Sequence, residues 1–87
     1  DIHRNYGYQI LNGTKNPSRD NVLKLCLACK LSIDESNRCL TLAGFNKLYS
    51  KNARDGLIIY FINNGYSVID ANLKLAELEL ELLGNVE

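Results

Sequence analysis

The chain has 87 residues, which are enough for one compact domain with one core and too few for two. Hydrophobic residues make up 46% of it and charged residues 23%, a composition that is typical of globular proteins and excludes a disordered chain. The net charge is zero, which argues against purely electrostatic binding of nucleic acid. Residues 1–30 nevertheless carry five basic and two acidic side chains, so we expect any anionic partner to meet the N-terminal third.

Residues 1–12 form the first predicted element, a helix with two unlike sides. Its apolar side is marked by Ile2, Tyr6, Ile10 and Leu11. The other side carries side chains of the kinds that read bases or bind phosphates in DNA complexes: Arg4, Asn5, Tyr8, Gln9 and Asn12. From composition alone, a solvated helix face is the commoner meaning of such a pattern.

Residues 18–44 and 53–83 are predicted to form two similar pairs of helices. Shifting the chain by 35 positions places the Arg-Asp step at 19–20 on the one at 54–55, and the apolar positions of the two segments also match. The other identities in this alignment are Ser32 with Ser67, Asn37 with Asn72 and Leu40 with Leu75.

Helix start and stop signals occur in both pairs. Ser18 can cap the first helix of the first pair, and Ser32 and Ser67 can cap the second helix of each pair. Gly44 and Gly65 can adopt the left-handed conformation that ends many helices. The chain is therefore expected to be a single helical domain over residues 1–87.

The last predicted helix runs from Ser67 to just before Gly84. Residues 77–82 alternate Glu and Leu, which alone favours a strand, but the helical stripe that leads into them favours a helix. The leucines of this helix would make a wide apolar face and a candidate homodimer surface: Leu73, Leu75, Leu78, Leu80, Leu82 and Leu83.

The two Arg-Asp steps stand at equivalent helix starts. We expect structural roles for them, with each Asp completing a helix cap and each Arg pairing locally, in preference to ligand binding. Tyr49, Lys51 and Arg54 could form a second phosphate contact, although a solvated loop is the commoner meaning of such a cluster.

Three cysteines, Cys26, Cys29 and Cys39, cannot all pair within one chain, which favours a reducing, cytoplasmic location. A structural zinc site needs four ligands, and His3 is the only histidine. Cys26 and Cys29 also fall on the predicted buried stripe, so we expect core cysteines and no metal or catalytic Cys–His pair.

Other functional classes find little support in the sequence. It contains no glycine-rich phosphate loop and no pair of carboxylates in a plausible cleft, so we expect neither an enzyme nor a cofactor. It has no secretory leader, and its longest apolar run, residues 57–62, is too short to cross a bilayer. We therefore expect no membrane partner.

The string Tyr6-Gly-Tyr-Gln-Ile-Leu-Asn-Gly-Thr-Lys-Asn-Pro-Ser-Arg-Asp20, followed by Lys30-Leu-Ser-Ile-Asp-Glu35, resembles a known family. It is similar to helix-turn-helix transcriptional regulators of the xenobiotic-response-element type, which share the fold of phage lambda repressor. The continuation from Leu40 to Asp55 resembles a bacterial subgroup with an added helical pair. The resemblance implies an all-α, lambda-repressor-like domain fragment of about five helices in repeated helix pairs.

The resemblance also implies a function, the sequence-specific binding of double-stranded DNA in transcriptional regulation. Residues 1–12 would be the recognition helix, and this sequence lacks the two helices that precede it in the family. We expect a further segment upstream of Asp1. Arg4, Asn5 and Gln9 would face base edges, and Tyr8 would face either bases or phosphates. The residues implied to hold phosphates are Asn12, Thr14 and Lys15.

The alternative is a helical protein–protein interaction module, either an adaptor or an antitoxin-like partner. The zero net charge and the acidic C-terminal two-thirds favour this alternative. The polar face of residues 4–12 and the string at 13–20 favour DNA.

Overall fold

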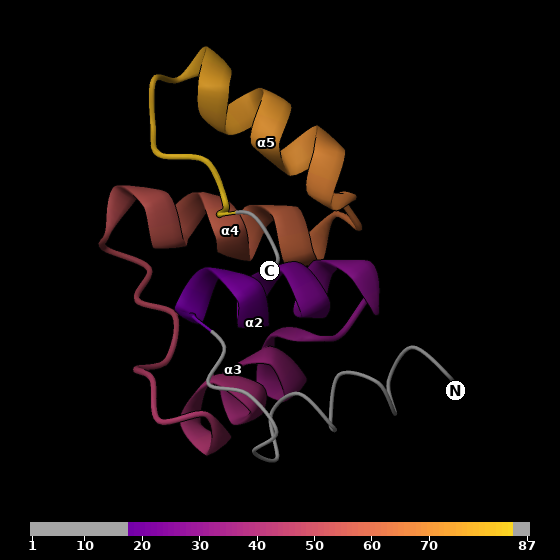
Figure 1. Cartoon of the computed structure of the whole chain (residues 1–87), viewed down its shortest axis with the longest axis vertical. Coiled ribbons are helices and arrows are strands. Elements are labelled where there is room, and N and C mark those ends of the chain that lie inside the picture. The colour runs from indigo at the N-terminus through magenta and orange to yellow at the C-terminus, as the bar shows by residue number, and fades with distance from the viewer. Residues whose placement is uncertain (1–17, 85–87) are drawn as a thin grey trace.

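In a computed structural model, residues 18–84 are described, and they form four α-helices with no strand among them. The helices are α2 (Arg19–Ala28), α3 (Ile33–Leu42), α4 (Ala53–Asn63) and α5 (Val68–Glu77). Figure 1 shows α2 and α4 side by side in the middle, with α3 beyond α2 and α5 beyond α4. The expectation of an all-α chain is confirmed for this part. The predicted helix over residues 1–12 lies outside the described residues.

The helix starts are fixed by side-chain caps, which the sequence predicts for α2, α3 and α5 but not for α4, whose cap is Asn52. Ser18 and Ser67 accept hydrogen bonds from the backbone N–H groups of Asn21 and Asp70, each at 3.1 Å. Ser32 forms a reciprocal capping box with Glu35. Each cap satisfies an N–H group that the helix cannot, and contributes about 1 kcal/mol.

The helix ends follow one pattern in both pairs. Gly44 and Gly65 have φ angles of +88° and +68°, as predicted for helix-ending glycines. The corresponding positions in the other pair are occupied by Glu79 and Lys30, with φ angles of +59° and +56°. In each pair, one helix is therefore followed by a glycine in the left-handed conformation and the other by a non-glycine residue in the same conformation. The left-handed conformation is strained for a residue that has a side chain.

The core is one cluster to which all four helices contribute. Phe61 of α4 lies at its centre, fully buried, and stacks on Tyr66 with 4.8 Å between ring centroids. The other fully buried large side chains are Val22, Leu23, Leu27, Leu40, Ile58 and Leu75. Burying a side chain of this size stabilises the fold by roughly 1.5–3 kcal/mol.

The predicted extension of the last helix to residue 83 is wrong. Helix α5 ends at Glu77, the backbone N–H of Leu80 returns to the carbonyl oxygen of Leu75 at 2.9 Å, and residues 80–84 are irregular. The N–H of Leu83 then donates to Asn72 Oδ1 at 2.8 Å, which holds the loop against α5 and buries Leu83. These bonds outweigh the helix propensity of the Glu and Leu residues, and the strand alternative does not occur here either.

Candidate functional site

The side chains predicted to contact DNA lie outside the described residues. They are Arg4, Asn5, Tyr8, Gln9, Asn12, Thr14 and Lys15. What the structure describes is the body to which this segment is joined. That body begins at Ser18, which caps α2, and at Arg19, which is the first residue of α2.

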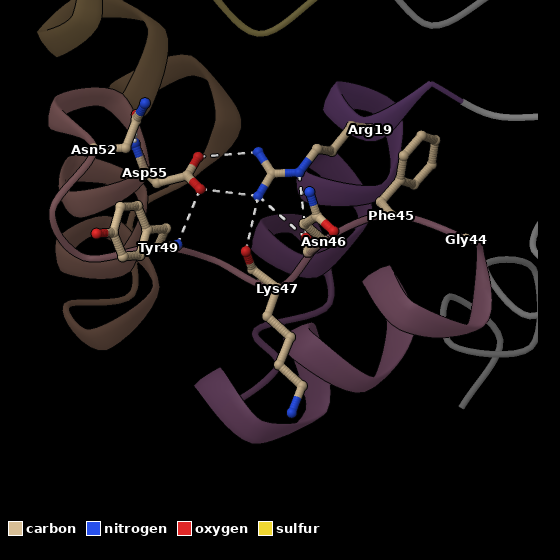
Figure 2. Close-up of a pocket in the computed structure, with 8 residues that line it drawn as sticks. All are labelled: Arg19, Gly44, Phe45, Asn46, Lys47, Tyr49, Asn52 and Asp55. Atoms are coloured by element: carbon tan, nitrogen blue, oxygen red, sulfur yellow. Dashed lines mark hydrogen bonds and ion pairs between the residues drawn. The ribbon is translucent and has the colours of Figure 1, made fainter.

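Arg19 ties the start of α2 to α4 and to the loop after α3. Its Nη1 and Nη2 atoms donate to Oδ1 and Oδ2 of Asp55, both at 2.9 Å, as Figure 2 shows. The same guanidinium also reaches the carbonyl oxygens of Asn46 and Lys47, at 3.3 and 3.4 Å. Asp55 Oδ2 accepts a further bond from the N–H of Tyr49 at 3.0 Å. Such a bidentate, charge-assisted pair is stronger and more directional than a single surface ion pair.

Arg54 makes the corresponding contacts from the start of α4 to α2. It donates from Nη1 and Nη2 to the two carboxylate oxygens of Asp20, at 3.0 and 3.1 Å, and Asp20 Oδ2 also accepts from the N–H of Gly84 at 3.2 Å. The carbonyl oxygens of Glu81 and Leu82 complete its set, at 2.8 and 2.9 Å.

Each of these partners stands 35 positions from the corresponding partner of Arg19. We call residues 18–49 the first repeat and residues 53–84 the second repeat, and each ion pair joins one repeat to the other. Reciprocal contacts of this kind are the mark of a two-fold arrangement. The expectation that each Arg pairs locally is wrong, because each reaches into the other repeat.

The electrostatics of the Arg19–Asp55 pair suit a structural bond. Burial by itself would raise the pKa of the Asp55 carboxyl, but the bonds from Arg19 and from the N–H of Tyr49 lower it below its usual value. The bond to Asp55 raises the pKa of Arg19. Both groups are therefore charged and bonded to each other at neutral pH, which leaves Asp55 a poor general base.

An open hollow of about 340 Å³ lies beside this pair. Figure 2 labels its lining residues: Arg19, Gly44, Phe45, Asn46, Lys47, Tyr49, Asn52 and Asp55. Its charged carboxylate and guanidinium bond to each other and to backbone, and Asn52 Oδ1 accepts the N–H of Asp55 at 2.9 Å. The carboxylate of Asp55, the guanidinium of Arg19 and the amide oxygen of Asn52 are thus already paired.

The candidate phosphate contact at Tyr49, Lys51 and Arg54 is not formed as one cluster. Arg54 is bound to Asp20 and to the chain at 81–82, while the backbone of Tyr49 is bound to Asp55 of the other ion pair. Lys51 is exposed in the loop before α4. The solvated-loop interpretation fits residues 49–51 better.

Two of the three cysteines are core residues. Cys26 and Cys39 are buried, and burial raises the pKa of the Cys26 thiol to about 12. Cys29 was expected on the same buried stripe but is only half-buried; it is the C-cap residue of α2 and packs against the edge of the core. Between residues 18 and 84, no group of three or more His, Cys, Asp or Glu residues is placed to hold a metal ion.

Three of the five basic side chains in residues 1–30 are bonded or buried within the fold. Arg19 is paired with Asp55, and Lys24 is buried. The ammonium group of Lys30 donates to the carbonyl oxygen of Gly65 at 2.6 Å, which joins the first repeat to the second. Of the basic residues counted in that third, Arg4 and Lys15 lie outside the described residues.

The leucines predicted to form one dimer face do not share a surface. Leu75 and Leu83 are core residues, and Leu80 is partly buried against the core. Leu73, Leu78 and Leu82 are exposed. The structure therefore divides the predicted face between the core and the solvent.

The sequence did not reveal the structural role of two asparagines. Asn37 Oδ1 accepts the N–H of Leu48 at 2.9 Å, and Asn72 Oδ1 accepts that of Leu83 at 2.8 Å. Each amide pins the loop that carries the carbonyl oxygens bound by an arginine. Their identity at the 35-residue offset was the available signal, but a short polar side chain within a helix does not reveal its partner.

Comparison with known proteins identifies no relative: no protein-family model, curated protein or solved structure matches the chain. Among the helices that the structure describes, none combines the length and apolar character needed to cross a membrane.

Proposed function

We propose that the chain binds double-stranded DNA sequence-specifically as part of a transcriptional regulator, with residues 1–12 as its recognition helix. The observation that carries the proposal is the amide-rich sequence of this segment, within a string that resembles helix-turn-helix regulators. Arg, Asn and Gln are the side chains best suited to the donor and acceptor patterns of the major groove.

The described body supports the proposal by the bonds at the point of attachment. Base reading needs side chains held to within about 0.5 Å, which requires a fixed support. The segment joins the body at Ser18, whose hydroxyl caps α2, and the next residue, Arg19, is bonded to α4 and to the chain at 46–47. The attachment point is thus braced by contacts from both repeats.

The charge distribution limits how such binding would work. Since Arg19 and Lys30 are already bonded within the fold, phosphate contacts would depend mainly on the basic residues before Ser18. We therefore expect a modest dependence of affinity on salt, and discrimination that comes from base contacts more than from charge.

The test is a series of binding isotherms on selected and scrambled duplexes over a range of salt, with the intact protein. Gln9→Ala and Asn5→Ala should each cost about 1–3 kcal/mol on the selected site and much less on scrambled DNA. Lys15→Ala should weaken both nearly equally and lower the salt slope by about one. Asn63→Ala, at an exposed position on α4, is the matched control.

The proposal fails if no duplex is preferred over any other, or if the Gln9 and Lys15 variants behave alike. Dimerisation, which would let the protein read two half-sites, is a separate prediction that sedimentation of the intact protein tests.

The second candidate function is a protein–protein interaction module. The observation that favours it is the set of large apolar side chains that the described body leaves exposed on α5 and the loop after it: Ile69, Leu73, Leu78 and Leu82. The two functions are compatible, since this surface belongs to α5 and the predicted recognition helix to residues 1–12.

A further inference from the structure

The two repeats differ most clearly on the outer side of their second helices. At equivalent positions 35 residues apart, α3 carries Asp34, Arg38 and Thr41 where α5 carries Ile69, Leu73 and Ala76, and all six residues are exposed. Ile69 and Leu73 expose 73% and 62% of their surface. At one other exposed position the difference is reversed, because α3 carries the apolar Leu42 where α5 carries the charged Glu77. The first repeat therefore shows that this backbone position is compatible with a polar, solvated face.

The three α5 residues form one stripe, which we call the α5 stripe (Ile69, Leu73 and Ala76). Spacings of four and three residues place them on one side of the helix. The opposite side of α5 is already used, because Ala71 and Leu75 are fully buried in the core. Figure 1 shows α5 at the outer end of the molecule, and the three side chains of the stripe are exposed there.

The surroundings of the α5 stripe are acidic. Successive residues of an α-helix are turned by about 100° around its axis, which places Asp70 and Glu77 next to the stripe on one side. Lys74 lies farther from the stripe on that side and pairs with Glu77 at 3.3 Å. Residues 68–84 contain four acidic side chains and one basic one, whereas the equivalent residues 33–49 contain two of each. The repeat that exposes the apolar stripe is thus also the one with net negative charge.

We propose that the α5 stripe is the docking site for a basic amphipathic helix of another protein. Apolar residues of that helix would cover Ile69 and Leu73, and its Lys or Arg residues would lie against the acidic border. A second copy of this chain fits less well, because a two-fold contact between α5 helices would bring the two acidic borders together. The proposal goes beyond DNA binding and does not depend on it.

The test uses three synthetic helical peptides and the isotopically labelled full chain. One peptide is amphipathic and built of Leu and Lys, the second replaces each Lys with Glu, and the third is a scrambled Leu–Lys sequence. The Leu–Lys peptide should bind one to one and shift the amide resonances of residues 68–77. The Leu–Glu and scrambled peptides should bind at least about tenfold more weakly, because they lack the charge or the apolar stripe.

The matched variant is Ile69→Asp combined with Leu73→Arg, which installs the residues that α3 already carries at the same positions. It should keep the helical content and melting temperature of the wild type and bind the Leu–Lys peptide at least about tenfold more weakly. Leu73→Gln is the milder second variant, and it should weaken binding in the same direction if the double variant does not fold.

Three outcomes would overturn the proposal. The first is no binding of the Leu–Lys peptide, and the second is binding that folded α5-stripe variants leave unchanged. The third is a dimer of the wild-type chain in sedimentation that the double variant abolishes, which would make a second copy the occupant of the stripe. A chain that binds the peptide but no DNA would uphold this site and refute the proposed DNA function.

Discussion

Arg19 and Arg54 stand 35 positions apart, and each binds the aspartate that follows the other in the sequence. Each also reaches two backbone carbonyl oxygens in the loop that follows the second helix of a repeat. The two arginines, with Asp20 and Asp55, therefore act as two equivalent clamps across the contact between the repeats. A bond of this kind makes each repeat depend on the other for its charged partners.

Removing either arginine should destabilise the fold by a similar amount. Arg19→Ala and Arg54→Ala are each expected to lower the free energy of unfolding by about 1–3 kcal/mol, because the first leaves the buried Asp55 and the second the half-buried Asp20 without its bidentate partner. Arg38→Ala, at an exposed position, is the control and should stay within about 0.5 kcal/mol of the wild type. Urea denaturation followed by circular dichroism measures all three. A large loss in one arginine variant and none in the other would show that the clamps are not equivalent.

Acid should weaken the clamp at Asp55. Its folded pKa is lowered, so its stabilising contribution is complete above the unfolded value of about 3.9 and is lost as the pH falls through the folded value. Asp55→Asn should therefore be less stable than the wild type at pH 7, and the difference should shrink as the pH falls below about 4. Urea titrations at a series of pH values measure this difference. If it stays constant down to the acid transition, the carboxylate does not have the lowered pKa.

The cysteines should react at different rates in the native state. Cys26 is buried with a raised pKa, so a thiol reagent should reach it only when the fold opens. Cys29 is half-buried and should react faster. Mass spectrometry after timed labelling and digestion separates the two sites, and labelling in denaturant supplies the reference rate. Rapid native labelling of Cys26 would contradict its place in the core, as would stoichiometric zinc that is lost together with the fold on chelation.

Adjacent leucines after α5 should tolerate a charge very differently. Leu83→Asp should cost more than about 3 kcal/mol, because it places a carboxylate in the core. Leu82→Asp, at an exposed position, should cost less than about 1 kcal/mol. Thermal unfolding of the two variants gives the comparison. Similar losses in both would mean that residues 80–84 do not lie against α5 as described, and would reopen the question of a longer helix.

Local signals in the sequence determined where three of the four described helices begin and where two of them end. The caps at Ser18, Ser32 and Ser67 and the stops at Gly44 and Gly65 were readable because each depends on residues within a turn of it. The 35-residue repeat was also readable, since it needs only comparison of the chain with itself. The predicted DNA-contacting face belongs to residues before Ser18, and its function stays a prediction.

Tertiary structure alone decided which distant groups meet. The sequence marked Arg19, Asp20, Arg54 and Asp55 as equivalent, but the choice between a local and a reciprocal pair depends on how two helices pack. The end of α5 was decided in the same way. Residues 77–82 have good helix propensity, worth only tenths of a kcal/mol per residue, and burial of Leu83 together with its bond to Asn72 outweighs it. Contacts between residues far apart in the chain carry these larger energies, and no local pattern records them.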